Sequence, residues 1–256
     1  MLIDSIYADL QNKGFSLIRN FINDLSDLSI LRYEALDLTN TLISSKSCTK
    51  RMRIHGFDGD LARIWGIENF LCDFTDNSLA ILDKTQLLEL VKYLLGDEIF
   101  LDLNRIHCQR SSYLHKLFWH RDSLEFGKAI IANIYLESES GFRLTDRANT
   151  NKIISKSGAY SSHNRQFMTI NARAGDLLVF DGGLFHQPYN LKPRLHLHFA
   201  FSSVMVNPAK HINSFLDHNC ACLNRNKILP YPMNNIKLKI KFLIQNLLDP
   251  IDRMIK

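Results

Sequence analysis

The chain has 256 residues, 46% of them hydrophobic, and a formal net charge of +5 at pH 7. This length and composition suit one large globular domain or two small ones. Most of the excess charge lies in residues 227–256, so the part before them is nearly neutral and does not predict a surface that binds nucleic acid.

Three features bear on where the protein resides. No apolar run approaches the roughly 20 residues of a membrane-spanning helix, and the N-terminal "MLIDSIYADLQNKGF" lacks the basic and then apolar leader of a secretory signal. The five cysteines are odd in number and irregularly spaced, which indicates reduced thiols rather than a disulfide scaffold. "CAC" at 220–222 could be half of a metal site, but no second Cys/His pair follows at finger-like spacing. We therefore expect a cytoplasmic protein.

Four segments carry apolar residues at helical spacing, namely 3–12, 23–44, 77–95 and 234–255. The last segment contains "IKLKIKF", which alone would also fit an alternating strand. Its apolar stripe would either dock on the domain or rest on an anionic membrane surface, and we favour docking with solvated lysines.

Between the third and fourth helical segments the pattern changes to short runs rich in β-branched and aromatic residues. These runs predict strands in "EIFLDLNRIHCQR", "KAIIANIYLES", "QFMTINA", "GDLLVFDG" and "RLHLHFAFSSVMV". No helix-length pattern alternates with them. Grouped strands with helices on both sides predict an antiparallel α+β or barrel-like core, and the absence of G-x-G-x-x-G and P-loop motifs agrees that the fold is not a doubly wound nucleotide fold.

The chain shows no internal repeat, low-complexity segment or linker, so we expect a single domain over 1–256. Within it, residues 1–98 would form a mostly helical N-terminal support, 99–206 the β core and 207–256 a C-terminal helical extension.

A candidate metal site begins in "KLFWHRDSLEF" at 116–126. In an extended segment, His120 and Asp122 point to the same face and can converge on one ion; the alternative is a solvated pair in a loop. His186, which follows "GDLLVFDGGLF", is the best-placed third ligand. Two histidines and one carboxylate are typical of non-haem Fe(II) oxygenases, whose open coordination positions take a cosubstrate and O₂.

Arg194 opens the strand "RLHLHFAFS" eight residues after His186. A planar guanidinium suits a buried carboxylate, which it can hold through two parallel hydrogen bonds. A dicarboxylate cosubstrate would chelate the metal at one end and need such a cation at the other. The alternative is a surface arginine at the end of a strand.

The order of "WHRD", "GDLLVFDGGLFH" and Arg194 resembles the Fe(II)- and 2-oxoglutarate-dependent oxygenases, and most closely the phytanoyl-CoA dioxygenase family. "GFSLIRNFI" at 14–22 and "LLELVKYLLGDEIFLDLNRIH" are also similar to that family, so the resemblance covers roughly residues 3–205. It implies a double-stranded β-helix, or cupin-like jelly roll, braced by helices. His120, Asp122 and His186 would bind Fe(II), and Arg194 would bind the distal carboxylate of 2-oxoglutarate.

Further site residues follow from the same resemblance. Arg105 lies where some relatives carry a second cosubstrate-binding arginine, although a simple salt bridge explains it as well. Asn133 and Tyr135 share one face of "IIANIYL" and would either hydrogen-bond the cosubstrate or serve ordinary strand packing, which we favour. His196 and His198 share the strand face of Arg194, and we favour their being core histidines with satisfied hydrogen bonds over groups that support the metal pocket.

The substrate side is less well defined by the sequence. "GFRLTDRANTNK" keeps Gly141 of the family pattern but loses its second half, so the substrate side of the pocket is expected to be remodelled. Arg121, Arg143 and Arg147 would face an anionic group or lie on the solvated surface, and we favour the surface. Phe118 and Trp119 would wall the pocket or pack in the core.

Together these patterns predict a 2-oxoglutarate-dependent dioxygenase that hydroxylates an unactivated carbon of a small molecule and forms succinate and CO₂. The substrate could be anionic or linked to a carrier, lipid or sugar. Two alternatives remain open: a catalytically inactive jelly roll that binds a ligand, and a zinc hydrolase that uses the same three residues.

Overall fold

A computed structural model describes residues 2–45, 53–55, 66–109, 115–116, 119–155, 166–190, 193–204, 212 and 214–216. The predicted helix at 234–255 and the "CAC" motif at 220–222 lie outside these residues, as does Phe118. The predicted boundaries of the domain and of its C-terminal extension therefore stay predictions.

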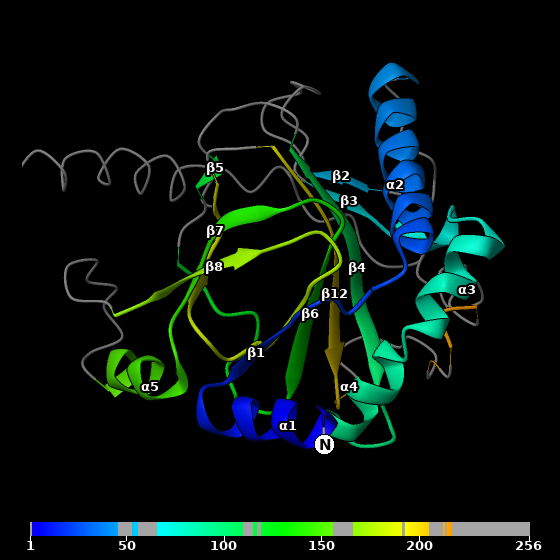
Figure 1. Ribbon diagram of the computed structural model, residues 1–256. Coiled ribbons are helices and arrows are strands. Elements are labelled where there is room, and N and C mark those ends of the chain that lie inside the picture. The colour runs from blue at the N-terminus through cyan, green and yellow to red at the C-terminus, as the bar shows by residue number, and fades with distance from the viewer. Residues whose placement is uncertain are drawn as a thin grey trace, which may run out of the picture. The chain divides into compact units, whose positions relative to one another are not determined.

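The main sheet has seven strands, and every neighbouring pair is antiparallel (Figure 1). In spatial order they are β1 (Phe15–Ile18), β9 (Leu177–Asp181), β6 (Ala129–Tyr135), β12 (Arg194–Ser202), β4 (Phe100–Gln109), β3 (Gly66–Glu68) and β2 (Arg53–His55). Four of these strands, β4, β6, β9 and β12, lie in segments whose composition predicts strands, and the fifth such segment forms β8 (Met168–Ala172) of another sheet.

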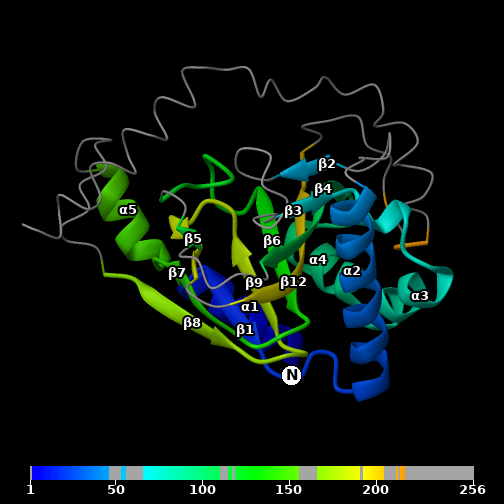
Figure 2. The same ribbon diagram turned by 90° about the horizontal axis from the view of Figure 1, so that it is seen from above.

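A smaller layer of strands faces one side of the main sheet, and helices α2 (Leu25–Ser45), α3 (Asp76–Lys84) and α4 (Leu87–Leu95) cover the other (Figure 2). The small layer contains the sheet β10 (His186–Gln187), β7 (Glu139–Leu144) and β8 (Met168–Ala172), and the pair β11 (Tyr189–Asn190) and β5 (His115–Lys116). Two antiparallel sheets packed face to face form a jelly roll.

Two apolar clusters fill the layers. Between the two sheets pack Ile131, Phe142, Leu144, Ile170 and Phe180. A larger cluster joins the helices to the main sheet and includes Leu31, Leu79, Val91, Leu197 and Phe199. Alternate residues of a strand point to opposite faces, so β12 contributes Leu197 and Phe199 to the helical side while His196 and His198 face the small sheet.

The N-terminal helices agree with the predicted segments, with one correction. α1 (Leu2–Asn12) and α2 (Leu25–Ser45) match the segments 3–12 and 23–44. The segment 77–95, expected as one helical patch, forms two helices, α3 (Asp76–Lys84) and α4 (Leu87–Leu95). The break falls at Gln86, which has φ 59°, a left-handed conformation that no helix continues through.

The described part of the segment 1–98 contains four α-helices and also contributes strands, because β1, β2 and β3 extend the main sheet; η2 (Phe70–Cys72) is a short 3₁₀ turn. The expectation of a strand region without helices was wrong: α5 (Arg147–Ser155) lies between β7 and β8. Its sequence "RANTNKIIS" has no apolar stripe, and polar contacts hold it instead: Arg147 bonds Asp181, and the buried hydroxyls of Thr145 and Thr150 lie 2.6 Å apart.

Within the described part of the chain, none of the helices has both the length and the apolar character needed to cross a bilayer.

Candidate metal centre

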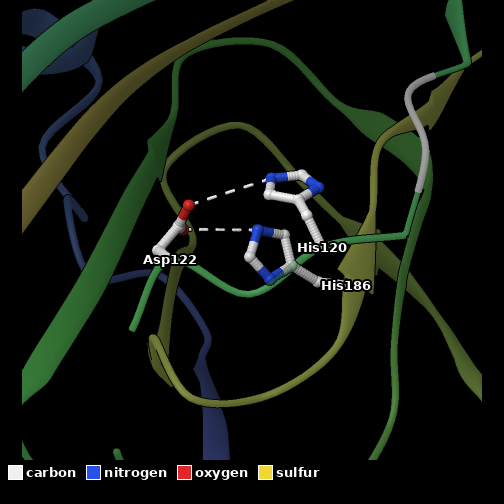
Figure 3. Close-up of side chains that lie close together, drawn as sticks. All are labelled: His120, Asp122 and His186. Atoms are coloured by element: carbon white, nitrogen blue, oxygen red, sulfur yellow. Dashed lines mark ion pairs between the residues drawn. The ribbon is translucent and has the colours of Figure 1, made fainter. Parts of the chain in front are cut away.

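Main-chain hydrogen bonds hold the His120–Asp122 segment against the loop and strand that carry His186. The amide of His120 donates to the carbonyl of His186 at 3.1 Å, and the amide of His186 donates back to the carbonyl of His120 at 2.9 Å. The amide of Asp122 donates to the carbonyl of Gly182 at 2.9 Å. These bonds hold the two stretches of chain side by side, and the side chains of His120, Asp122 and His186 point toward one another (Figure 3).

The three side chains bring one ligand atom each into a small volume. Nε2 of His186 lies 3.3 Å from Oδ2 of Asp122, and Nε2 of His120 lies 3.8 Å from Oδ1. The three ligand atoms lie within 4.8 Å of one another. Two atoms that each coordinate one ion at about 2.1 Å are at most about 4.2 Å apart, so both measured pairs fit coordination of a shared ion.

The protonation of the two kinds of ligand also suits a cation. Nδ1–H of His186 donates to the carbonyl of Leu184 at 3.0 Å, which orients the ring so that Nε2 is the atom that faces Asp122 and a metal. Burial acts to raise the pKa of Asp122, but the neighbouring His186 and His120 outweigh it and hold that pKa well below its ordinary value. The carboxyl group is therefore ionised and ready to bind.

The buried carboxylate of Asp181 fixes the turn beneath Asp122. It accepts hydrogen bonds from the amides of Gly127 and Gly183, each at 2.8 Å, and from Nη2 of Arg147 at 3.0 Å. Burial raises the pKa of Asp181, and these donors oppose the rise. A Cβ atom on Gly183 would lie 2.9 Å from the ring of Phe126, so the turn has no room for a larger residue there.

A cavity of about 390 Å³ opens beside the three candidate ligands. Polar side chains from β4, β6 and β12 form much of its wall. These are Asp102, Arg105, His107, Asn133, Arg194, His196, His198 and Ser202.

Arg194 lies in this cavity wall and is only 1% exposed. Its Nη1 lies 3.8 Å from Oε1 of Glu139 at the start of β7, and the other carboxylate oxygen of Glu139 lies 2.8 Å from Nδ1 of His196. Burial lowers the pKa of Arg194, and the charge of Glu139 opposes this. Sequence reasoning missed Glu139, because nothing in "LESESGF" distinguishes it from Glu137 or points to a partner on a distant strand.

The other predicted cosubstrate residues divide into two groups. Arg105 lines the cavity, but its Nη2 also forms a 2.5 Å ion pair with Glu68. Asn133 lines the cavity and accepts a hydrogen bond from Nδ1 of His198 at 2.8 Å. Tyr135 is not among the described residues that line the cavity; it is 1% exposed and packs against His196 with ring centroids 5.3 Å apart.

Both of the neighbouring histidines line the cavity and have hydrogen-bond partners. His196 bonds Glu139 on one side and Nδ1 of His107, at 2.8 Å, on the other. His198 bonds Asn133 and stacks on His107 with ring centroids 4.9 Å apart. Both residues therefore have the hydrogen-bond partners expected of satisfied histidines, and a supporting role toward the metal ligands stays a prediction.

The three arginines considered for substrate binding do not line the cavity among the residues described. They are also half-buried rather than solvated, which corrects the favoured expectation. Arg121 donates to the carbonyl of Leu124, Arg143 lies 3.6 Å from the ring centroid of Tyr189, and Arg147 bonds Asp181. Trp119 packs on Phe167 at 5.6 Å.

Comparison with solved structures identifies the fold, whereas comparison of sequences finds no relative. No protein-family model matches the chain, and no curated protein matches it in sequence, so the likeness to phytanoyl-CoA dioxygenases stays a prediction. Solved structures do match. AviO1 from Streptomyces viridochromogenes Tue57 superposes with a TM-score of 0.61 at 13% identity, over 82% of this chain and 97% of that one.

Two further structures are similar and were solved with ligands. EctD from S. alaskensis with bound Fe has a TM-score of 0.60 at 14% identity, covering 82% of this chain and 78% of that one. The epimerase SnoN, in complex with Fe³⁺, alpha-ketoglutarate and nogalamycin RO, has a TM-score of 0.56 at 14% identity, covering 78% and 83%. The predicted jelly-roll fold is thus confirmed.

Proposed function

We propose that the protein is a non-haem Fe(II)- and 2-oxoglutarate-dependent dioxygenase that hydroxylates a carbon of a small molecule and releases succinate and CO₂. The observation that carries the proposal is the convergence of His120, Asp122 and His186 on one wall of a cavity that also contains a buried arginine. Structures of similar fold that hold iron and alpha-ketoglutarate support it.

The residues present fit such a site. His120, Asp122 and His186 would hold Fe(II), the donor set that is typical of this class of oxygenase. With 2-oxoglutarate and O₂, the iron would supply the oxidising power, and the protein would supply binding and orientation.

Arg194 would bind the distal carboxylate of 2-oxoglutarate, because a buried guanidinium offers a planar pair of donors to a carboxylate. Phe142 and Phe180 pack against the ring of His186 at centroid distances of 5.7 and 5.0 Å. These aromatic rings keep water away from one side of the metal ligands and fix the plane of the imidazole.

The test is anaerobic addition of Fe(II) and then 2-oxoglutarate to the purified chain. The expected result is a weak visible charge-transfer band of the chelated cosubstrate, lost in His120→Ala and retained in Arg121→Ala, whose side chain lies outside the cavity wall. Well-folded protein without the band, or a band that persists in His120→Ala, contradicts the proposal.

Succinate formation by the same protein preparation under air distinguishes the dioxygenase from the two alternative functions. A binding module turns over no 2-oxoglutarate, and a zinc hydrolase is inhibited by added Fe(II). A dioxygenase requires Fe(II) to form succinate.

A further inference from the structure

Besides the residues proposed to bind the metal and 2-oxoglutarate, the cavity wall has a second set of polar groups, on β12. The inward-facing residues of that strand follow one another at every second position: Arg194, His196, His198, Ala200 and Ser202. Arg194 would meet the cosubstrate. The residues further along the strand lead away from Arg194 and line the rest of the cavity.

The hydrogen-bonding state of His198 is set by its neighbour on β6. Its Nδ1 lies 2.8 Å from Oδ1 of Asn133, an amide oxygen that only accepts, so Nδ1 carries the proton. Burial, followed by the nearby charge of Arg105, lowers the pKa of His198 well below its ordinary value, so the ring is neutral. A neutral ring that is protonated at Nδ1 has a lone pair at Nε2, and the partly exposed side chain offers it to the cavity.

Two serines in the wall offer the same kind of group. The hydroxyl of Ser202 donates to the carbonyl of Val204 at 2.8 Å, and the hydroxyl of Ser123 donates to the carbonyl of Glu125 at 2.8 Å. Each hydroxyl donates its only proton to the main chain, so toward the cavity it acts as an acceptor. The oxygen of Ser123 also accepts from the amide of Glu125 at 3.2 Å, which leaves it one lone pair, whereas no such bond is found for Ser202 among the described residues. The carboxylate of Asp102 adds another acceptor to the wall.

This set of acceptors needs a ligand that donates hydrogen bonds. 2-Oxoglutarate does not qualify, because its two carboxylates and ketone only accept at neutral pH. An ammonium group donates as well, but it cannot accept from the cationic donors of Arg105 and Lys128, which line the same cavity beside the carboxylates of Asp102 and Asp122. A hydroxyl group both donates and accepts, so it suits the acceptors and the donors of this wall, and the apolar Leu103, Ile131 and Ala200 suit the C–H faces between hydroxyls.

We propose that His198 is a substrate-binding residue, that its Nε2 accepts a hydrogen bond from a substrate hydroxyl, and that the substrate is a polyhydroxylated small molecule rather than an acyl chain. This inference rests on the proposed oxygenase function and narrows its substrate class.

The experiment has two arms on the full chain with Fe(II) under argon. The first titrates 2-oxoglutarate by its visible band in the wild type, His198→Phe and His198→Gln. The second measures calorimetric binding of hexoses, pentoses and inositols to the 2-oxoglutarate complex, with cyclohexanol and hexanoate as controls that lack several hydroxyls. Phenylalanine removes the acceptor, whereas glutamine keeps an amide oxygen.

The expected result is an unchanged affinity for 2-oxoglutarate in all three proteins. At least one polyhydroxylated compound should bind the wild type, about tenfold more weakly in His198→Phe, and at an intermediate affinity in His198→Gln. The inference is overturned if no polyol binds, if His198→Phe binds as tightly as the wild type, or if hexanoate or cyclohexanol is preferred. In each of these cases a visible band in the wild type still supports the oxygenase function. Absence of the band in the wild type overturns the function itself.

Discussion

Glu139 and His196 form a hydrogen bond of 2.8 Å inside the protein, between Oε2 of the carboxylate and Nδ1 of the imidazole. The second oxygen of Glu139 lies 3.8 Å from Arg194, whose side chain is 1% exposed. One buried carboxylate thus balances the candidate cosubstrate cation and orients a histidine of the cavity wall.

Glu139→Ala is therefore expected to lower the free energy of unfolding by about 3 kcal/mol, because it removes a buried carboxylate that lies 3.8 Å from the buried guanidinium of Arg194. Urea unfolding measures this. The matched control is Glu137→Ala, two residues earlier, whose ion pair with the 48% exposed Arg32 is expected to contribute less than about 1 kcal/mol. Equal losses in the two variants would show that Glu139 is not a structural counter-ion.

Removal of one metal ligand is expected to abolish iron binding. Asp122→Asn keeps the size of the side chain but removes the charge that offsets the cation. We expect wild-type protein to bind one equivalent of Fe(II) in anaerobic dialysis, and Asp122→Asn and His186→Ala to retain little or none. Arg121→Ala, between the two ligands of the first segment, is expected to bind iron as the wild type does, since its side chain bonds the carbonyl of Leu124 instead.

Arg194 and Arg105 can be distinguished by two 2-oxo acids. Arg194→Met is expected to weaken 2-oxoglutarate binding by about tenfold or more, because a charge-assisted pair is lost, and to leave 2-oxobutyrate, which lacks the distal carboxylate, unaffected. Titration of the visible band measures both. Arg105→Gln breaks the ion pair with Glu68. If it weakens 2-oxoglutarate selectively as well, then Arg105 is a second cosubstrate residue.

Local patterns in the sequence predict much of this architecture. The spacing of His120 and Asp122 is a property of any extended segment, and the β-branched runs mark β4, β6, β9 and β12 without tertiary information. Arg194 could therefore be placed on a strand, and His120 and Asp122 on an extended segment, which the structure pairs with His186 through an isolated bridge rather than a full strand.

The features that sequence reasoning missed depend on contacts between distant segments. Glu139 matters only because β7 faces the start of β12, and the His198–Asn133 pair depends on the register of β12 with β6. α5 has no apolar stripe to reveal it. The break at Gln86 has no glycine to mark it, although Gln86 adopts a left-handed conformation.

The buried histidines predict how stability depends on pH. Burial is the main cause that lowers the pKa of His107, which is 7% exposed, well below the ordinary value of 6.5. The unfolded chain then binds a proton at a pH where the folded chain does not, so the stability is complete above about pH 6.5 and falls as the pH decreases below it. We expect His107→Gln to lose about 1 kcal/mol less free energy of unfolding than the wild type between pH 6.5 and 5, because one such group contributes at most about 1.4 kcal/mol per pH unit. Urea unfolding of metal-free protein at several pH values provides the measurement, and parallel curves for the two proteins would show that His107 is not buried in its neutral form.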